Sequence, residues 1–183
     1  HKATIIPRGR ALGMVMRLPE RDQLSVTREK MHSDIAVAMG GRIAEEIIFG
    51  HDKVTSGASS DIDMVTKLAK NMVTKYGMTT ELGTIAYGEN EEEVFLGRSV
   101  TKSQNMSEET AKKIDEEISL IIEKQYKRAC SILKKNKNKL SSLATRLVEK
   151  EVIFKEDLVK ILGERPFSKK IEKVKEVKEN NKD

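Results

Sequence analysis

The sequence has few of the residues that build small disulfide-linked or strand-rich domains. It contains 1 cysteine, 3 prolines and no tryptophan, and aromatic residues make up only 4% of its 183 positions. A single cysteine excludes an internal disulfide framework. The scarcity of aromatics and prolines argues against a sandwich or barrel of short strands. These absences favour a helical fold whose core is large enough to be stable without cross-links.

Long uncharged runs are also missing. Charged residues make up 34% of the chain, and every window of about 18 residues contains at least one, so no segment is predicted to span a membrane. The first residue is His1, and no basic head with an apolar run follows it, as a signal peptide would require. We therefore expect this sequence to be a piece of a longer protein.

The net charge of +5 raises the possibility of nucleic-acid binding. Part of the excess lies in residues 168–183, which hold 6 lysines and 4 acidic residues. The rest is spread over helices of mixed charge, without the basic stripe and interleaved aromatics of a nucleic-acid-binding face. We predict that nucleic acid is not a partner, that 1–167 form one domain, and that 168–183 are a disordered tail.

The N-terminal residues are typical of short strands. An extended stretch over 3–6 ends at the turn signal Pro7-Arg8-Gly9, and residues 12–18 alternate loosely before Pro19. Helices are predicted over 28–49 and 61–76, and then over 107–135, 140–148 and 155–162, from apolar residues spaced three to four apart. The fold class is therefore predicted to be mainly α, with a small N-terminal β element.

Several local signals mark the ends of these helices. Thr27 and Gly50 have the residue types expected before and after the first helix. Its internal pair Gly40-Gly41 suggests that another backbone packs closely there. Ser60 and Asp63 have the spacing of a capping box for the second helix. Residues 78–105, with an acidic run from Glu89 to Glu93, are predicted to be a surface loop.

The histidines and the cysteine do not form a site by spacing. His1, His32 and His51 include no H-E-x-x-H motif and no i,i+4 pair, so the sequence contains no self-contained zinc site. We expect His32 to cap or pack near a helix start and His51 to face solvent. Cys130 lies within a helix beside Ala129 and is predicted to be a small packing residue.

Three acidic residues have two possible interpretations each. Asp61, at the entrance of a helix, is either a helix-dipole residue or a metal ligand held in place by the Ser59 and Ser60 hydroxyls. Glu45 and Glu46 are expected on a solvated face, where Arg42 is placed for a weak i,i+4 ion pair with Glu46. Composition does not decide between these interpretations.

Four segments together resemble the FtsH family of ATP-dependent zinc proteases. They are His1–Gly13 with Leu18-Pro19-Glu20, Ile35–Gly50, Thr55–Ile62, and Asn71-Met72-Val73 with Tyr76-Gly77-Met78. The resemblance covers about residues 1–88 in order, and the helices up to Phe167 fit the C-terminal helices of the family more loosely.

The resemblance implies a membrane-anchored homo-hexamer that degrades unfolded and membrane polypeptides. An AAA module binds ATP and Mg²⁺, and the anchor lies in the bacterial inner membrane with the peptidase domain on the cytoplasmic side. Zn²⁺ is held by two histidines of an H-E-x-x-H helix and by an aspartate that corresponds to Asp61. The family's edge strand, which pairs with an extended substrate, implies substrate-binding residues at Thr4, Ile5, Ile6, Leu12, Gly13 and Met14.

The sequence departs from the family pattern because it lacks H-E-x-x-H and the AAA module. In the family this motif precedes the position of His1, so we expect a truncation just after it. The catalytic glutamate and two of the three ligands are then missing, and the fragment is expected to be inactive and to bind little zinc. The alternative is a non-catalytic oligomerisation or scaffold module built from helices within 107–162.

Overall fold

The computed structural model describes residues 2–7, 9, 13–16, 25–87 and 106–164. The chain divides into two compact units, which the sequence did not indicate. One consists of His1–Asp22 and Asn136–Asp183, and the other of Gln23–Lys135. None of the helices in the described ranges is both long and apolar enough to cross a membrane. The predicted tail, 168–183, lies outside the described residues.

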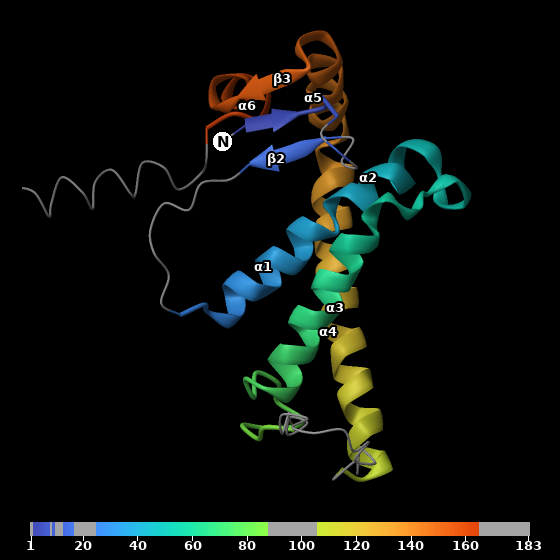
Figure 1. The fold of residues 1–183 in the computed structure, drawn as a ribbon, viewed down its shortest axis with the longest axis vertical. Helices are drawn as coiled ribbons and strands as arrows, with labels where there is room; N and C mark the ends of the chain where they lie inside the picture. Colours follow the sequence, from blue (N-terminus) through green and yellow to red (C-terminus); the bar gives the residue numbers. More distant parts are fainter. Residues whose placement is uncertain (1, 8, 10–12, 17–24, 88–105, 165–183) are drawn as a thin grey trace, which may run out of the picture. The chain divides into compact units, whose positions relative to one another are not determined.

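The described part of Gln23–Lys135 is built around one long helix. Its helices are α1 (Arg28–Ala38), α2 (Gly40–Phe49), α3 (Ser59–Thr74) and α4 (Glu108–Lys135) (Figure 1). Helix α4 packs against each of the other three, and their apolar stripes meet in one core. The buried core residues are Met31, Ile35, Ala36, Met39, Ile43, Val65, Ala69, Met72, Val73, Leu82, Ile114, Ile121 and Ala129.

The prediction of one continuous helix over 28–49 is wrong at its centre. The helix is interrupted at Met39, which ends α1 and precedes α2. The break falls where Gly40 and Gly41 lower the helix propensity and where the Met39 side chain is buried in the core. The expected close approach of a backbone is absent as well, because a methyl group on either glycine would meet none of the described atoms within 4 Å.

The outer ends of this helical region are as predicted. Thr27 Oγ1 accepts the N–H of Lys30 at 3.3 Å, which caps the first turn of α1. At the other end, Gly50 has a φ of 85° and its N–H donates to the Glu46 carbonyl at 3.1 Å. A residue with a side chain would be strained in that conformation.

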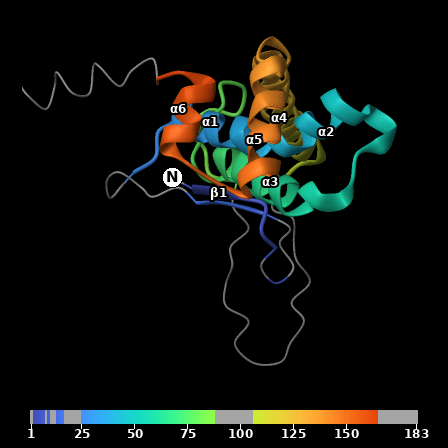
Figure 2. The same cartoon turned by 90° about the horizontal axis from the view of Figure 1, so that it is seen from above.

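The connection from α2 to α3 contains two short 3₁₀ turns, η1 (His51–Lys53) and η2 (Ser56–Ala58). In both views this segment loops out from the end of α2 and returns to the start of α3 (Figures 1 and 2). Helix α3 begins at Ser59, directly after η2, without a side-chain cap. The predicted capping box is therefore wrong, because Ser60 already lies inside the helix.

The unit formed by the N- and C-terminal parts of the chain contains a small antiparallel sheet. Strands β1 (Lys2–Thr4), β2 (Met14–Met16) and β3 (Val152–Phe154) have the order β2-β1-β3. The two N-terminal strands were expected, although both are shorter than predicted, and Ile5 and Ile6 lie outside them. The sequence analysis missed β3.

Two helices complete this unit. Helix α5 (Lys137–Lys150) is longer than predicted at both ends, whereas α6 (Lys155–Leu162) has the predicted bounds. Both pack against β3, whose Ile153 is fully buried. Helices dominate the described residues and the sheet is small, so the predicted fold class is confirmed.

Candidate metal-ligand site at the start of helix α3

Asp61 lies in the first turn of α3. Its side chain is half-buried, and it makes no hydrogen bond or ion pair within the described part of the chain. The backbone N–H groups of a first helical turn favour a negative charge at this position. Asp61 is thus a carboxylate on a helix, and no described residue occupies its oxygen lone pairs.

The segment before Asp61 is fastened to α2 through Thr55. The N–H and the hydroxyl of Thr55 donate to Glu45 at 2.9 and 2.8 Å, and its carbonyl accepts from Arg42 at 3.0 Å. Thr55 Oγ1 also accepts the N–H of Gly57 at 3.2 Å. Since Gly57 lies in η2, which leads directly into α3, this cluster fixes the start of the helix that carries Asp61. We call Arg42, Glu45 and Thr55 the Thr55 clamp.

Two acidic residues of α2 hold fixed positions. The hydrogen bonds from the backbone N–H and hydroxyl of Thr55 lower the pKa of Glu45, which favours its ionised form. The neighbouring Glu46 accepts a hydrogen bond from the hydroxyl of Tyr126 on α4. Burial, together with Glu46, raises the pKa of Tyr126 to about 12, so this phenol remains a donor at neutral pH. Helix α2 is therefore tied to α4 on one side and to Thr55 on the other.

These contacts correct two expectations. Glu45 and Glu46 are half-buried and both accept hydrogen bonds, so they do not form a simply solvated face. The Arg42–Glu46 ion pair does not occur in the described structure, because the Arg42 guanidinium reaches the Thr55 carbonyl instead.

The interpretation of Asp61 as a metal ligand expects the Ser59 and Ser60 hydroxyls to hold it in place, and they do not have this role. Ser59 and Ser60 are exposed, and within the described residues neither hydroxyl makes a hydrogen bond. The support for the start of α3 comes from Thr55. The sequence signal for this role is a threonine two residues before a glycine, which is a frequent side-chain turn.

A complete metal site is not present among the described side chains. No group of three or more His, Cys, Asp or Glu residues there could hold a metal ion. His51 faces solvent as predicted, with 87% of its side chain exposed. Cys130 packs partly buried against the core, which is also as predicted. Asp61 is therefore a single candidate ligand.

The predicted substrate-binding residues lie in and around the sheet. Thr4 belongs to β1, the middle strand, which pairs with β2 on one side and β3 on the other. Its side chain is buried, and its hydroxyl donates to the Glu151 carbonyl at 3.0 Å. Met14 begins β2 at one edge of the sheet, and Gly13 directly precedes it. Leu12 lies outside the described residues.

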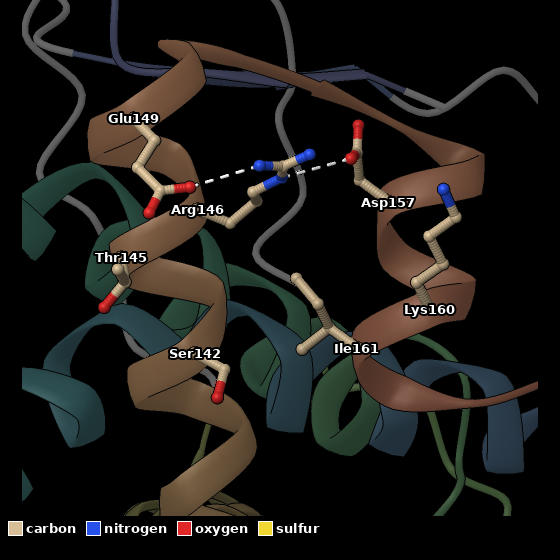
Figure 3. A pocket seen from close by; sticks show the side chains of 7 residues that line it. All are labelled: Ser142, Thr145, Arg146, Glu149, Asp157, Lys160 and Ile161. Carbon is tan, nitrogen blue, oxygen red and sulfur yellow. Dashed lines mark hydrogen bonds and ion pairs between the residues drawn. The ribbon is translucent and has the colours of Figure 1, made fainter.

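A polar hollow of about 380 Å³ lies between α5 and α6 (Figure 3). Within it, Arg146 donates to Glu149 at 3.1 Å and to Asp157 at 3.3 Å. Asp157 also accepts from Lys150, which does not line the hollow, at 2.8 Å. The bond from Lys150, with a contribution from Arg146, lowers the pKa of Asp157. These ion pairs form a network that joins the two helices beside the hollow. Its lining residues are Ser142, Thr145, Arg146, Glu149, Asp157, Lys160 and Ile161.

Comparison with known proteins places the chain in a family of peptidases. The model of peptidase family M41 matches residues 1–161, and the chain belongs to this family. It is similar to proteins named ATP-dependent zinc metalloprotease FtsH. The relative from Caulobacter vibrioides is 52% identical over 162 residues, which are 88% of this chain and 26% of the relative.

Two further relatives with the same name give the same result. The identity is 51% for Rickettsia bellii, over 90% of this chain and 26% of the relative. It is 45% for Haemophilus influenzae, over 92% of this chain and 26% of the relative. The resemblance to the FtsH family is confirmed, and the chain spans about a quarter of the length of these relatives.

Proposed function

We propose that this chain forms the C-terminal part of the peptidase domain of an ATP-dependent zinc metalloendopeptidase, and that Asp61 is one of its zinc ligands. The main support is the state of Asp61, a half-buried carboxylate without a protein partner among the described residues. It lies on a helix whose start is held by the Thr55 clamp. The similarity to FtsH zinc metalloproteases supplies the metal and the reaction class.

The chemistry of the donor set fits zinc in part. A carboxylate oxygen is a normal zinc ligand, and catalytic zinc sites use three protein ligands with one open position. Asp61 can supply one of the three. The sequence contains no H-E-x-x-H motif, so the remaining two ligands and the general base would have to lie outside these 183 residues.

The residues of this chain would bind the zinc ion and keep its ligand in position, and they would not transfer protons. When bound, zinc polarises a scissile carbonyl and lowers the pKa of a water molecule. Asp61 would add one negative oxygen ligand, while Glu45 and Arg42 would keep the start of α3 in place through Thr55. Ligand geometry matters here, because weakening the outer support of a metal site commonly reduces metal affinity by about 10- to 100-fold.

The substrate would be a polypeptide bound in an extended conformation along β2. Strand β1 is paired on both sides, so β2 and β3 are the two edge strands of the sheet. Of these two, β2 is the one formed by N-terminal residues. An extended peptide can add to such an edge by main-chain hydrogen bonds. Val15 and Met16 are exposed there, by 69% and 46%. In this proposal Gly13 and Met14 would contact the substrate, and Thr4 would support Met14 as its partner in the neighbouring strand β1.

The parent protein would be a homo-hexamer anchored in the bacterial inner membrane, with its peptidase domain in the cytoplasm. ATP and Mg²⁺ would bind to an AAA module outside this sequence. Exposed apolar side chains, including Leu120 on α4 and Val148 on α5 at 56% and 73%, are compatible with contacts between subunits. Light scattering of the 183-residue chain tests the alternative of a self-sufficient assembly module, which a monomer at high concentration would contradict.

The ligand assignment is tested in the full-length protein that contains this sequence. Asp61→Ala should lose both bound zinc, measured by plasma mass spectrometry, and ATP-dependent degradation of casein. Asp63→Ala is the matched control, because Asp63 is an exposed carboxylate two residues further along α3, and it should retain both. Normal zinc content in Asp61→Ala would remove Asp61 from the ligand set. A wild-type protein without zinc or proteolysis would contradict the proposed function itself.

A further inference from the structure

Four basic residues lie on the neighbouring helices α1 and α4. Arg28 and His32 are one helical turn apart on α1, and Lys124 and Arg128 are one turn apart on α4. The two helices pack against each other. The positive charges of Arg28, Lys124 and Arg128 all act on His32. We call these residues the basic patch.

No carboxylate neutralises this basic patch within the described structure. Arg28 donates to the Met78 carbonyl at 3.4 Å, and Arg128 donates to the side chain of the buried Gln125 at 3.4 Å. Both partners are neutral, and Lys124 makes no ion pair there. Burial, followed by the charges of Arg28, Lys124 and Arg128, lowers the pKa of His32. Among the described residues, these like charges therefore have no acidic counter-ion.

The sequence of α4 concentrates positive charge at this place. Residues 108–117 contain 5 acids and 2 lysines, whereas residues 123–135 contain 5 basic residues and 1 acid. Basic residues near a helix C-terminus are favoured by the helix dipole, but this effect fades within the last turn. It accounts for Lys134 and Lys135, and not for Lys124 and Arg128, which lie further back.

We propose that the basic patch binds an acidic segment of a partner polypeptide. Arginine donors match carboxylates in a bidentate geometry. The acidic first half of α4 confines the positive charge of this helix to its second half, while a membrane or a phosphate backbone suits a wide basic face. The basic patch also contains no aromatic side chain on which a base could stack. The binding does not require zinc and goes beyond the proposed protease activity.

The test uses the 183-residue chain and a short fluorescein-labelled peptide of alternating glutamate and glycine. Fluorescence anisotropy should show binding that weakens as salt is added, because the contacts are between exposed charges. The same peptide with glutamine in place of glutamate should not bind. Phosphatidylglycerol vesicles and a single-stranded oligonucleotide are measured in parallel, and tighter binding of either one than of the acidic peptide would overturn the proposal.

A charge-matched pair of variants locates the site. Lys124→Glu with Arg128→Glu should weaken peptide binding by about tenfold or more, which corresponds to about 1.4 kcal/mol. The control, Lys67→Glu with Lys70→Glu, makes the same change in net charge at exposed positions of α3 and should have little effect. Equal losses in the two variants would show a nonspecific charge effect and contradict the proposal. If the first variant does not fold, as judged by circular dichroism, Lys124→Gln with Arg128→Gln replaces it.

His32 provides a readout that a purely structural role would not change. A bound carboxylate should raise the pKa of its imidazole, because the added negative charge favours the protonated form. The shift is followed by NMR titration with and without the peptide, and His32→Gln identifies the signal. Binding that leaves the titration of His32 unchanged would place the peptide elsewhere on the chain and overturn the proposal.

Discussion

Thr4 and Glu151 are joined by a hydrogen bond although 147 residues separate them in the sequence. The Thr4 hydroxyl donates to the Glu151 carbonyl at 3.0 Å, and the N–H of Ile5 donates to the same oxygen at 3.0 Å. Thr4 Oγ1 also accepts the N–H of Ile6 at 3.1 Å. One buried hydroxyl thus connects β1, the residues that follow it, and the turn between α5 and β3.

Thr4→Val should destabilise the chain by about 1–2 kcal/mol, since valine has nearly the same shape but cannot make the part-buried hydrogen bonds of the Thr4 hydroxyl. Urea unfolding measures the loss, and amide exchange at Ile6 should accelerate. Thr80→Val is the control, because Thr80 is exposed and surface changes usually stay within about 0.5 kcal/mol. Equal stability of the two variants would show that the Thr4 hydroxyl contributes little.

Glu151→Gly should stabilise the chain. Glu151 follows the last residue of α5 with a φ of 57°, the one positive value among the described residues other than glycine. Glycine adopts this conformation without the strain of a side chain, so we expect a gain of about 0.5–1 kcal/mol in urea unfolding. Ser141→Gly, at an exposed position inside α5, should instead lose about 0.5 kcal/mol. A loss in Glu151→Gly would show that its side chain has a stabilising role.

The sequence predicted those elements whose signals are local. The bounds of α6 and the Thr27 cap follow from neighbouring residues, as does the cap of α4, where Ser107 Oγ accepts the N–H of Thr110 at 3.2 Å. Strand β3 was missed because three residues give almost no periodicity, and its pairing with β1 joins the two ends of the chain. The break at Met39 depends on core packing of α1 and α2 against α4, which sequence periodicity does not contain.

The candidate site was predictable only in part, for the same reason. The family resemblance selected Asp61, and the structure adds that it lacks a described partner. The role of Thr55 was not predicted, because its partners Arg42 and Glu45 lie 13 and 10 residues away on another helix. Contacts of this kind require the turn of the α2–α3 connection, which no local pattern specifies.

Gly77→Ala should be strongly destabilising, by about 2–4 kcal/mol. Gly77 has a φ of 57° after the end of α3, and a methyl group there would lie 2.8 Å from the Thr84 Cα. The left-handed conformation costs about 1–2 kcal/mol for a residue with a side chain, and the backbone contact adds to this cost. Gly83→Ala is the control, because its φ is 66° but a methyl group would meet no described atom within 4 Å. Thermal unfolding of both variants separates strain from the steric clash, and equal losses would argue against the clash.

Glu45→Ala should loosen the α2–α3 connection without unfolding α2. The N–H and the hydroxyl of Thr55 would lose their acceptor, so amide exchange at Thr55 and Gly57 should accelerate, as measured by NMR or mass spectrometry. Asp52→Ala, a change at an exposed carboxylate in the same connection, should leave this exchange unchanged. Acceleration in both variants would mean that the connection is sensitive to any lost charge, and that Glu45 has no special role in the clamp.

Stability should fall in mild acid because of His32. Its pKa lies below the ordinary value of 6.5, so between these two pKa values the unfolded chain binds a proton that the folded chain does not. The free energy of unfolding contributed by this residue is therefore lost as pH decreases below about 6.5. Urea unfolding at pH values on either side of 6.5 should show a smaller loss in His32→Gln than in the wild type. Lys124→Gln should also reduce the loss, because it removes one of the charges that oppose protonation. Identical pH dependence in all three proteins would contradict this account. It would show that the neighbouring arginine and lysine side chains do not influence the protonation of His32.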